Sequence, residues 1–176
     1  MNKNTLIVFQ TNYGFSEKVA NFIADTIKHT NTKIDVCDVE DAAHMVFFTY
    51  QHIFIVTPIK YGSYSRSMLQ FLKQFSHISP THHVSVISID LVSRKEGRNT
   101  LETNKQVKKM WDKIGWYPQS LTLIAGELNY NKYNFIEKRL MQMLMTIMKG
   151  PTSLTTSENY TDWEYLRRSV LNDLEK

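Results

Sequence analysis

The chain alternates short, almost wholly apolar runs with longer segments in which apolar residues recur every three or four positions. Runs of the first kind are typical of strands buried on both faces, and segments of the second kind are typical of amphipathic helices. A repeated strand–helix order favours an α/β fold with a parallel sheet between layers of helices. The strands are expected at about 5–10, 33–39, 52–57, 84–91 and 121–125, and the helices at about 14–28, 41–48, 63–75, 99–114 and 162–174.

Five strands with intervening helices predict a doubly wound sheet of order 2-1-3-4-5. In such a sheet a ligand lies beyond the carboxyl ends of the first and third strands, where the strand order reverses. The segments expected there, residues 10–16, 58–64 and 90–98, are polar and each contains a glycine. The length of 176 residues fits one domain, residues 1–176, without a linker or repeat.

The first of these segments carries three hydroxyl side chains and a glycine, in Thr11, Tyr13, Ser16 and Gly14. It lies between a strand and a helix, where backbone N–H groups and the helix dipole favour an anion. It has neither the Gly-Lys-Ser/Thr of a nucleoside-triphosphate loop nor the G-x-G-x-x-G of a dinucleotide site. A phosphate monoester bound by neutral donors, as in flavodoxin-like proteins with FMN, is the functional interpretation. The structural alternative is an ordinary turn capped by Ser16.

The other two segments offer an aromatic ring and several cations. Residues 58–62 place Tyr61 and Gly62 where a flavin ring would lie, and the alternative is a plain connecting loop. Residues 90–98 lead into a basic run that continues to residue 113, and such runs are usually solvated helix faces. The functional alternative places Arg94, Lys95 and Arg98 at the ligand rim, where they would attract carboxylates or lipid phosphates.

Composition restricts the partners and excludes several classes of site. A net charge of +4 and a pI of about 9.1 suit an anionic partner such as a membrane surface or a carboxylated substrate. The single Cys37 excludes a disulfide framework, and the six histidines lack ligand spacing, so we expect no metal. No apolar run reaches the roughly 18–20 residues of a membrane span, and neither a signal peptide nor a nucleic-acid motif is recognisable.

Residues 127–159 form too long a stretch for a simple loop in a compact domain. Within it, residues 133–149 show a polar stripe at helical spacing on a mostly apolar background that holds four of the eight methionines. This pattern predicts an inserted helix that ends at Gly150-Pro151. The structural interpretation is a helix packed on the body of the protein. The functional ones are an interfacial helix with its apolar side in lipid, or an adaptable pocket wall for a bulky flat ligand.

Several longer motifs make a more specific resemblance. They are Ile59-Lys-Tyr-Gly-Ser-Tyr64, Asp90-Leu-Val-Ser-Arg-Lys95, Thr103-Asn104, Ile124-Ala-Gly-Glu-Leu-Asn-Tyr130, the methionine-rich helix with Gly150, and Tyr160-Thr-Asp-Trp163. With these motifs the chain resembles, over essentially its whole length, the flavodoxin-like, menaquinone-dependent protoporphyrinogen oxidases of bacterial haem synthesis. Two positions depart from flavodoxins generally. Tyr13 stands where the phosphate loop usually has Thr, so its hydroxyl is expected to reach elsewhere, and Phe15 replaces a usually polar residue.

The resemblance implies FMN as cofactor, protoporphyrinogen IX as substrate and menaquinone as electron acceptor. It implies no side-chain acid or base, because the flavin carries the redox chemistry. Cofactor contacts are expected from Thr11, Asn12, Tyr13, Gly14, Phe15, Ser16, Pro58, Ile59, Lys60, Tyr61, Gly62, Asp90, Leu91, Val92 and Arg94. Arg94, Lys95 and Arg98 are expected to pair with the propionates of the substrate. Residues 133–149, from Tyr133 to Lys149, are expected to touch the inner face of the cell membrane, which makes the protein cytoplasmic and peripherally associated.

Two other functions remain open on the sequence. One is a flavodoxin-type electron carrier that docks on protein partners and has no substrate of its own; the basic charge and the inserted helix disfavour it. The other is a quinone reductase fed by a nicotinamide cofactor, for which no segment offers a nicotinamide site.

Overall fold

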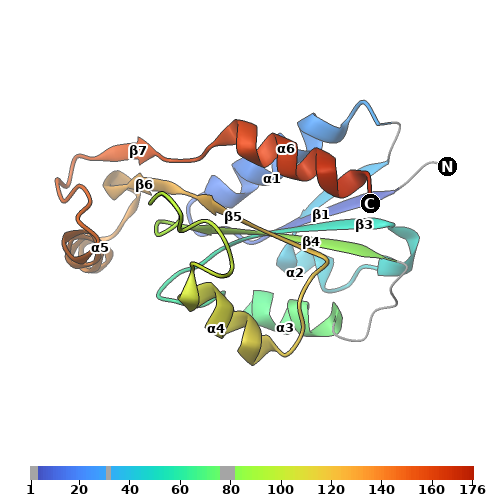
Figure 1. Cartoon of the computed structure of the whole chain (residues 1–176), viewed down its shortest axis with the longest axis horizontal. Coiled ribbons are helices and arrows are strands. Elements are labelled where there is room, and N and C mark those ends of the chain that lie inside the picture. The colour runs from blue at the N-terminus through green and yellow to red at the C-terminus, as the bar shows by residue number, and fades with distance from the viewer. Residues whose placement is uncertain (1–3, 31–32, 76–81) are drawn as a thin grey trace.

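The centre of the structure is a five-stranded parallel sheet (Figure 1). The structure, a computed structural model, describes residues 4–30, 33–75 and 82–176. The strand order is β2-β1-β3-β4-β5, which confirms the predicted 2-1-3-4-5 arrangement. The strands are β1 Thr5–Phe9, β2 Ile34–Asp38, β3 His52–Pro58, β4 His83–Asp90 and β5 Ser120–Ala125.

The central strands are mostly apolar because each separates two hydrophobic cores. In β3, Ile53 and Ile55 belong to one core, whereas Phe54 and Val56 belong to the other. This alternation follows from the two-residue period of a strand. Neither face of the strand meets water, so the sequence shows a continuous apolar run instead of an apolar–polar alternation.

Five helices cover the two faces of the sheet. They are α1 Phe15–Ile27, α2 Val39–Ala42, α3 Arg66–Gln74, α4 Lys105–Ile114 and α6 Trp163–Leu174. The apolar sides of α1 and α6 pack in one core and those of α2, α3 and α4 in the other. Figure 1 accordingly shows α1 and α6 above the sheet and α3 and α4 below it.

Capping side chains set helix starts that the apolar periodicity misplaced. The helix predicted over 99–114 begins only at Lys105, because the Asn104 side chain accepts the backbone N–H of Val107 at 3.3 Å. The helix predicted over 63–75 begins after the cap Ser65 in the same way. The short helix predicted over 41–48 has the wrong bounds, since Asp38 caps a four-residue helix that ends at Ala42 and a separate 3₁₀ turn, η1 Phe47–Thr49, follows.

The segment between β5 and α6 holds a helix, α5 Phe135–Ile147, which lies beyond the carboxyl end of the sheet (Figure 1). The same segment contains β6 Glu127–Asn129, the 3₁₀ turn η3 Tyr130–Lys132 and β7 Ser157–Asn159, and β6 pairs antiparallel with β7. The two short strands were not predicted, because three-residue strands carry too few side chains for a periodic signal. Within the described residues no helix is both long enough and apolar enough to cross a membrane.

Both ends of α5 are fixed by local hydrogen bonds. At its start, Asn134 and Glu137 form a capping box, in which each side chain accepts the other's backbone N–H. At its end, Lys149 takes a left-handed φ of 53°, and the N–H of Gly150 donates to the Met145 carbonyl at 2.8 Å. The helix is therefore shorter than the predicted 133–149, and Lys149, not the glycine, makes the left-handed turn.

Candidate functional site

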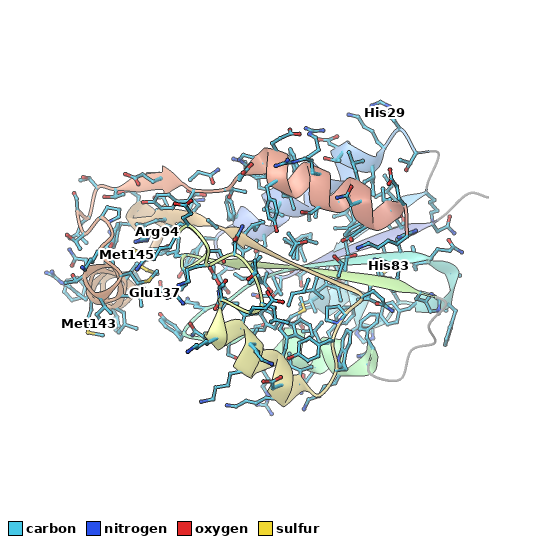
Figure 2. The ribbon with its side chains drawn as sticks, in the orientation of Figure 1. His29, His83, Arg94, Glu137, Met143 and Met145 are labelled. Atoms are coloured by element: carbon cyan, nitrogen blue, oxygen red, sulfur yellow. The ribbon has the colours of Figure 1, made fainter. Side chains whose placement is uncertain are left out.

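A cavity of about 350 Å³ lies between the carboxyl ends of the central strands and α5. It occupies the switch point between β1 and β3, where a doubly wound sheet binds its ligand. Its volume falls in the usual range of about 300–1,000 Å³ for small-molecule sites. Figure 2 shows Glu137 and Met145 on the side of α5 that faces the sheet, and Met143 on its outer side.

The cavity brings together all but two of the residues predicted to contact a cofactor. Those that line it are Thr11, Asn12, Tyr13, Phe15, Ser16, Pro58, Ile59, Lys60, Tyr61, Gly62, Asp90, Leu91 and Val92. Gly14 and Arg94 are outside the lining. The structure thus gathers the three predicted loops around one cavity, and their contact with FMN stays a prediction.

The first loop leaves the start of α1 without a side-chain cap. Gly14, with a φ of 84°, is the capping residue, and its own N–H donates to Thr11 Oγ1 at 2.8 Å. Ser16 lies inside the first turn and is buried, so the interpretation of Ser16 as the cap is wrong. By contrast, α3, α4, α5 and α6 all have side-chain caps. The first N–H groups of α1 therefore remain available to an anion.

The second loop is a tight reversal with Tyr61 at its tip. Lys60 and Ser63 exchange backbone hydrogen bonds of 2.9 and 3.2 Å, and Tyr61 and Gly62 have φ values of 51° and 83°. Two successive positive φ angles are typical of a type I′ turn. The Tyr61 side chain is 67% exposed at the rim of the cavity. A Cβ on Gly62 would lie 2.4 Å from Nε2 at the movable end of the exposed Gln106 side chain, so it is the positive φ that favours glycine at this position.

Asp90 holds the third loop in place. One carboxylate oxygen accepts the backbone N–H of Ser93 at 2.6 Å, and the other accepts from Asn104 Nδ2 at 2.9 Å. Because Asn104 also caps α4, the buried Asp90 joins the end of β4 to the start of that helix. Leu91 and Val92 are thereby positioned at the cavity wall.

The three cations predicted to bind carboxylates have different surroundings. The Arg94 guanidinium reaches the end of α5, where Nη2 donates to the Met148 carbonyl at 3.2 Å and Nη1 lies 3.6 Å from Met145 Sδ. Lys95 and Arg98 are exposed, and Arg98 Nη1 donates to the Thr103 carbonyl at 3.0 Å. None of the three cations lines the cavity, and their pairing with a carboxylated ligand stays a prediction.

Glu137 joins two of the loops to α5. Its Oε1 accepts the Tyr13 hydroxyl at 2.5 Å and lies 2.7 Å from Lys60 Nζ. These two bonds lower the pKa of Glu137 to about 2. Burial would lower the pKa of Lys60, but the bonds to Glu137 and Tyr13 raise it overall. Burial and the bond to Glu137 raise the pKa of Tyr13. At neutral pH the cluster is therefore a carboxylate, an ammonium and a neutral hydroxyl.

Sequence reasoning did not assign Glu137 to the site, although Asn134-x-x-Glu137 carries the signature of a capping box. The wall that α5 supplies agrees with the interpretation of residues 133–149 as an adaptable pocket wall, but its individual residues were not assigned to the site. The residues of α5 and its C-cap at the cavity, besides Glu137, are apolar: Leu140, Met141, Met143, Leu144, Ile147 and Met148. Further lining residues that were not predicted are Ile89, Gln106, Gly126, Glu127 and Tyr133. The methionine content of residues 133–149 was the signal for this wall.

The outward side of α5 is apolar and exposed. Phe135, Ile136, Met143 and Ile147 are each more than 60% exposed. Met145 and Met148, in contrast, are buried in a small third core with Leu128 and Tyr130. The interpretation of α5 as a helix packed on the body therefore holds for one side of the helix only.

A second hollow, of about 600 Å³, lies on the flank of α1 beside Trp163 of α6. Its lining includes the exposed polar side chains of Glu17, Lys18 and Asp25. It is larger than the cavity beside α5 and reaches Gly14 of the first loop, but no residue of the second or third loop lines it, so we place the functional site in the cavity. Among the described residues no cluster of three or more His, Cys, Asp or Glu side chains is arranged to hold a metal ion.

Comparisons with known proteins give a family and a fold. The family model described as a flavodoxin domain matches residues 6–155. A protein of Leishmania major named protoporphyrinogen IX dehydrogenase (quinone) is 30% identical over 164 residues, which are 93% of this chain and 71% of that protein. The protein of the same name from Escherichia coli K12 is 28% identical over 160 residues, which are 91% of this chain and 88% of that protein.

Solved structures share the fold at low sequence identity. Flavodoxin 1 from Bacillus cereus has a TM-score of 0.58 and 15% identity, with 98% of each chain covered. A flavodoxin from Streptococcus pneumoniae has a TM-score of 0.52 and 12% identity, with 97% of each chain covered. These similarities agree with the strand order of the sheet.

Proposed function

The chain belongs to the flavodoxin-like protoporphyrinogen oxidases, and we propose that it oxidises protoporphyrinogen IX to protoporphyrin IX with FMN as cofactor and menaquinone as electron acceptor. The observation that carries the proposal is the cavity itself. Three loops of a flavodoxin sheet form its floor, and the apolar side chains of α5 form a wall against it. An apolar wall suits a porphyrinogen and a quinone, which are both poorly soluble in water.

The residues of the first loop fit a flavin phosphate. The loop provides hydroxyl groups and the uncapped N–H groups of α1, and it provides no cation. Such neutral donors bind a phosphate through hydrogen bonds and the helix dipole. The rest of the cavity offers Ile59, Leu91 and Val92 to a flat ring. A bound flavin would supply two-electron redox chemistry, so the six-electron oxidation of the substrate requires three rounds.

The protein's own part in the reaction is to bind, to orient and to exclude water. The α5 wall covers the ring loops, so the reacting part of the substrate would lie between Tyr61 and the methionine side chains. Unbranched methionines adapt to a bulky ligand better than branched residues do. The exposed Lys95 and Arg98 are available at the outside of the third loop for the propionates of the substrate.

Peripheral contact with the inner face of the cell membrane is the second part of the proposal. The exposed side chains of Ile136, Met143 and Ile147 form an apolar face on α5; Arg139 on the same helix is exposed and Lys138 is half-buried. An amphipathic helix of this kind lies in the membrane interface with its cations near the headgroups. Met143 and Ile147 also line the cavity, so its mouth opens at the face that would meet lipid. Both apolar ligands would then enter from the membrane.

An anaerobic mixing experiment tests the chemistry. The purified, FMN-loaded protein is mixed with protoporphyrinogen IX while the flavin absorbance is followed, and a menaquinone analogue is added afterwards. Bleaching followed by reoxidation is expected, and free FMN without the protein serves as the control. If protein that binds FMN keeps its flavin oxidised, the substrate assignment is wrong and the electron-carrier alternative is favoured.

A further inference from the structure

Three parts of the chain that are distant in sequence meet at one oxygen atom. Tyr13 lies in the first loop, Lys60 in the second, and Glu137 in the first turn of α5; Tyr13 and Glu137 are 124 positions apart. All three side chains line the cavity. Lys60 Nζ also lies 3.2 Å from the Tyr13 hydroxyl and 5.2 Å from the centroid of its ring. The predicted phosphate loop, the predicted ring loop and the inserted helix are thus joined by a single polar cluster.

The cluster is stronger than an ordinary surface ion pair. The Glu137 side chain is only 20% exposed and that of Lys60 36%, and one carboxylate oxygen takes two donors. Hydrogen bonds to an ionised acceptor are shorter and stronger than neutral ones, and limited solvent access reduces their screening. A fully exposed pair would contribute little by comparison. The cluster is therefore able to transmit a displacement of the loops to α5.

The two ends of α5 are held differently. At the carboxyl end, Met145 and Met148 are buried and Arg94 binds the Met148 carbonyl. At the amino end, Phe135 and Ile136 are more than 70% exposed, and the apolar packing comes from Tyr133 just before the helix, whose ring lies 5.2 Å from that of Tyr13. The bonds of Glu137 add a second link from this end of α5 to the loops. The amino end is consequently the part of α5 whose position depends on the two loops.

We propose that Glu137 is a positioning residue. It couples the position of α5 over the cavity to the binding of FMN by the first and second loops. A flavin that orders the loops around Tyr13 and Lys60 also orders their two donors, and these hold the amino end of α5 over the cavity. Because coupling between two sites is reciprocal, a seated α5 strengthens FMN binding by the same factor. The inference rests on the proposed flavin site. It also accounts for Tyr13, whose hydroxyl reaches Glu137 and not the phosphate-binding turn itself.

The substitution Glu137→Gln separates this role from helix capping. Glutamine has the same size and still accepts the Asn134 N–H, because a capping box tolerates Gln. It removes the charge that holds Lys60. The matched control is Asp112→Asn. The Asp112 carboxylate also binds a tyrosine and a lysine, Tyr117 at 2.5 Å and Lys108 at 3.6 Å, but it does so on the exposed side of α4.

The direction in which Glu137→Gln changes the affinity for FMN distinguishes a positioning role from a simple charge effect. Removal of a carboxylate near a bound phosphate would tighten FMN binding if only Coulomb repulsion mattered. Positioning predicts the opposite, a rise of about 5- to 10-fold in the FMN dissociation constant, at the lower end of the range for coupled sites. Titration with FMN, followed by the quenching of flavin fluorescence, measures this constant for the wild type, Glu137→Gln and Asp112→Asn.

Hydrogen exchange provides a second readout that does not depend on activity. In the wild type and in Asp112→Asn, FMN is expected to slow amide exchange in residues 135–147, and in Glu137→Gln this slowing is expected to be lost. The milder Tyr13→Phe removes only the hydroxyl and should act in the same direction. Combined with Glu137→Gln it should add little, because the cluster is already broken.

The outcomes distinguish a failure of the proposed cofactor site from a failure of the coupling through Glu137. If the wild type binds no FMN, the proposed cofactor site and the coupling both fail. If the wild type binds FMN but Glu137→Gln binds it equally well or more tightly, the coupling is overturned and the cofactor assignment stands. An unchanged exchange rate in residues 135–147 upon FMN binding to the wild type overturns the coupling as well.

Discussion

The double substitution Met143→Asp, Ile147→Asp should release the protein from lipid vesicles. Full burial of a large aliphatic side chain contributes about 1.5–3 kcal/mol. Met143 is 62% and Ile147 72% exposed, so roughly two thirds of that gain is still available to a membrane at each position. The two substitutions together therefore remove about 2–4 kcal/mol of binding free energy. Because 1.4 kcal/mol corresponds to a factor of ten, vesicle binding should weaken about 30-fold or more.

The assay is co-sedimentation with vesicles that contain anionic lipid, over a range of lipid concentrations. The matched control is Val46→Asp, Phe48→Asp. These side chains are 65% and 79% exposed. They lie just before β3, near the amino ends of the strands, whereas α5 lies beyond the carboxyl ends. Both double variants add the same charge and remove similar apolar surface. Exposed positions change the free energy of unfolding little, so urea unfolding should show both variants folded.

Equal vesicle binding by the wild type and the folded Met143→Asp, Ile147→Asp variant would refute the membrane role of α5. A loss of binding in the Val46→Asp, Phe48→Asp control of the same size would also refute it, because general charge, and not the face of α5, would then determine binding. Loss in the first variant with retention in the control is the expected result.

Three further predictions follow from charge, conformation and pH. The pKa of Glu137 in the folded protein is lowered from 4.5 to about 2, so its contribution to stability should be present above pH 4.5 and be lost as the pH falls toward 2. The difference in the free energy of unfolding between the wild type and Glu137→Gln should therefore vanish as the pH falls through that range. Reversal of charge by Lys95→Glu with Arg98→Glu should raise the Michaelis constant for protoporphyrinogen IX, and an unchanged constant would remove both residues from the substrate site. Gly62→Ala should cost about 1–2 kcal/mol in urea unfolding from its φ of 83° alone. Gly97→Ala, at a φ of 70° with open space around its Cβ, should cost about the same, because Gly62→Ala meets only the movable end of the Gln106 side chain; a clearly larger cost at Gly62 would mean that this side chain cannot move away.

Much of the scaffold could be predicted because its signals are local. Each central strand is buried on both faces, so it shows as a short apolar run in the sequence, such as the four residues Ile53–Val56. The order of alternating strands and helices then leaves few topologies, and the strand order 2-1-3-4-5 followed. The three loops at the strand ends could be predicted for the same reason, since parallel strands end at a common edge.

Helix starts were less predictable, because one side chain decides them. The apolar periodicity of a helix does not show at which preceding polar residue the helix begins. The first turn is instead fixed by a capping side chain, Asn104 or Ser65, that accepts a backbone N–H of the helix. The same is true of Asp38, whose cap moved a predicted helix to Val39–Ala42. These caps can be recognised once a helix is known, but the residue pattern alone offers several candidates.

The sequence by itself determined the sheet, the three loops that meet at the carboxyl ends of its strands and the presence of the methionine-rich helix. Only the tertiary structure decided what the charged residues do. Arg94 binds the end of α5 from 54 positions away, and Tyr13 binds Glu137 from 124 positions away. Local periodicity and composition do not indicate which residues so far apart in the sequence will contact each other. They form because the packing of α5 against the carboxyl end of the sheet brings their polar atoms within reach in a partly dry site, where a charged group gains most from a partner.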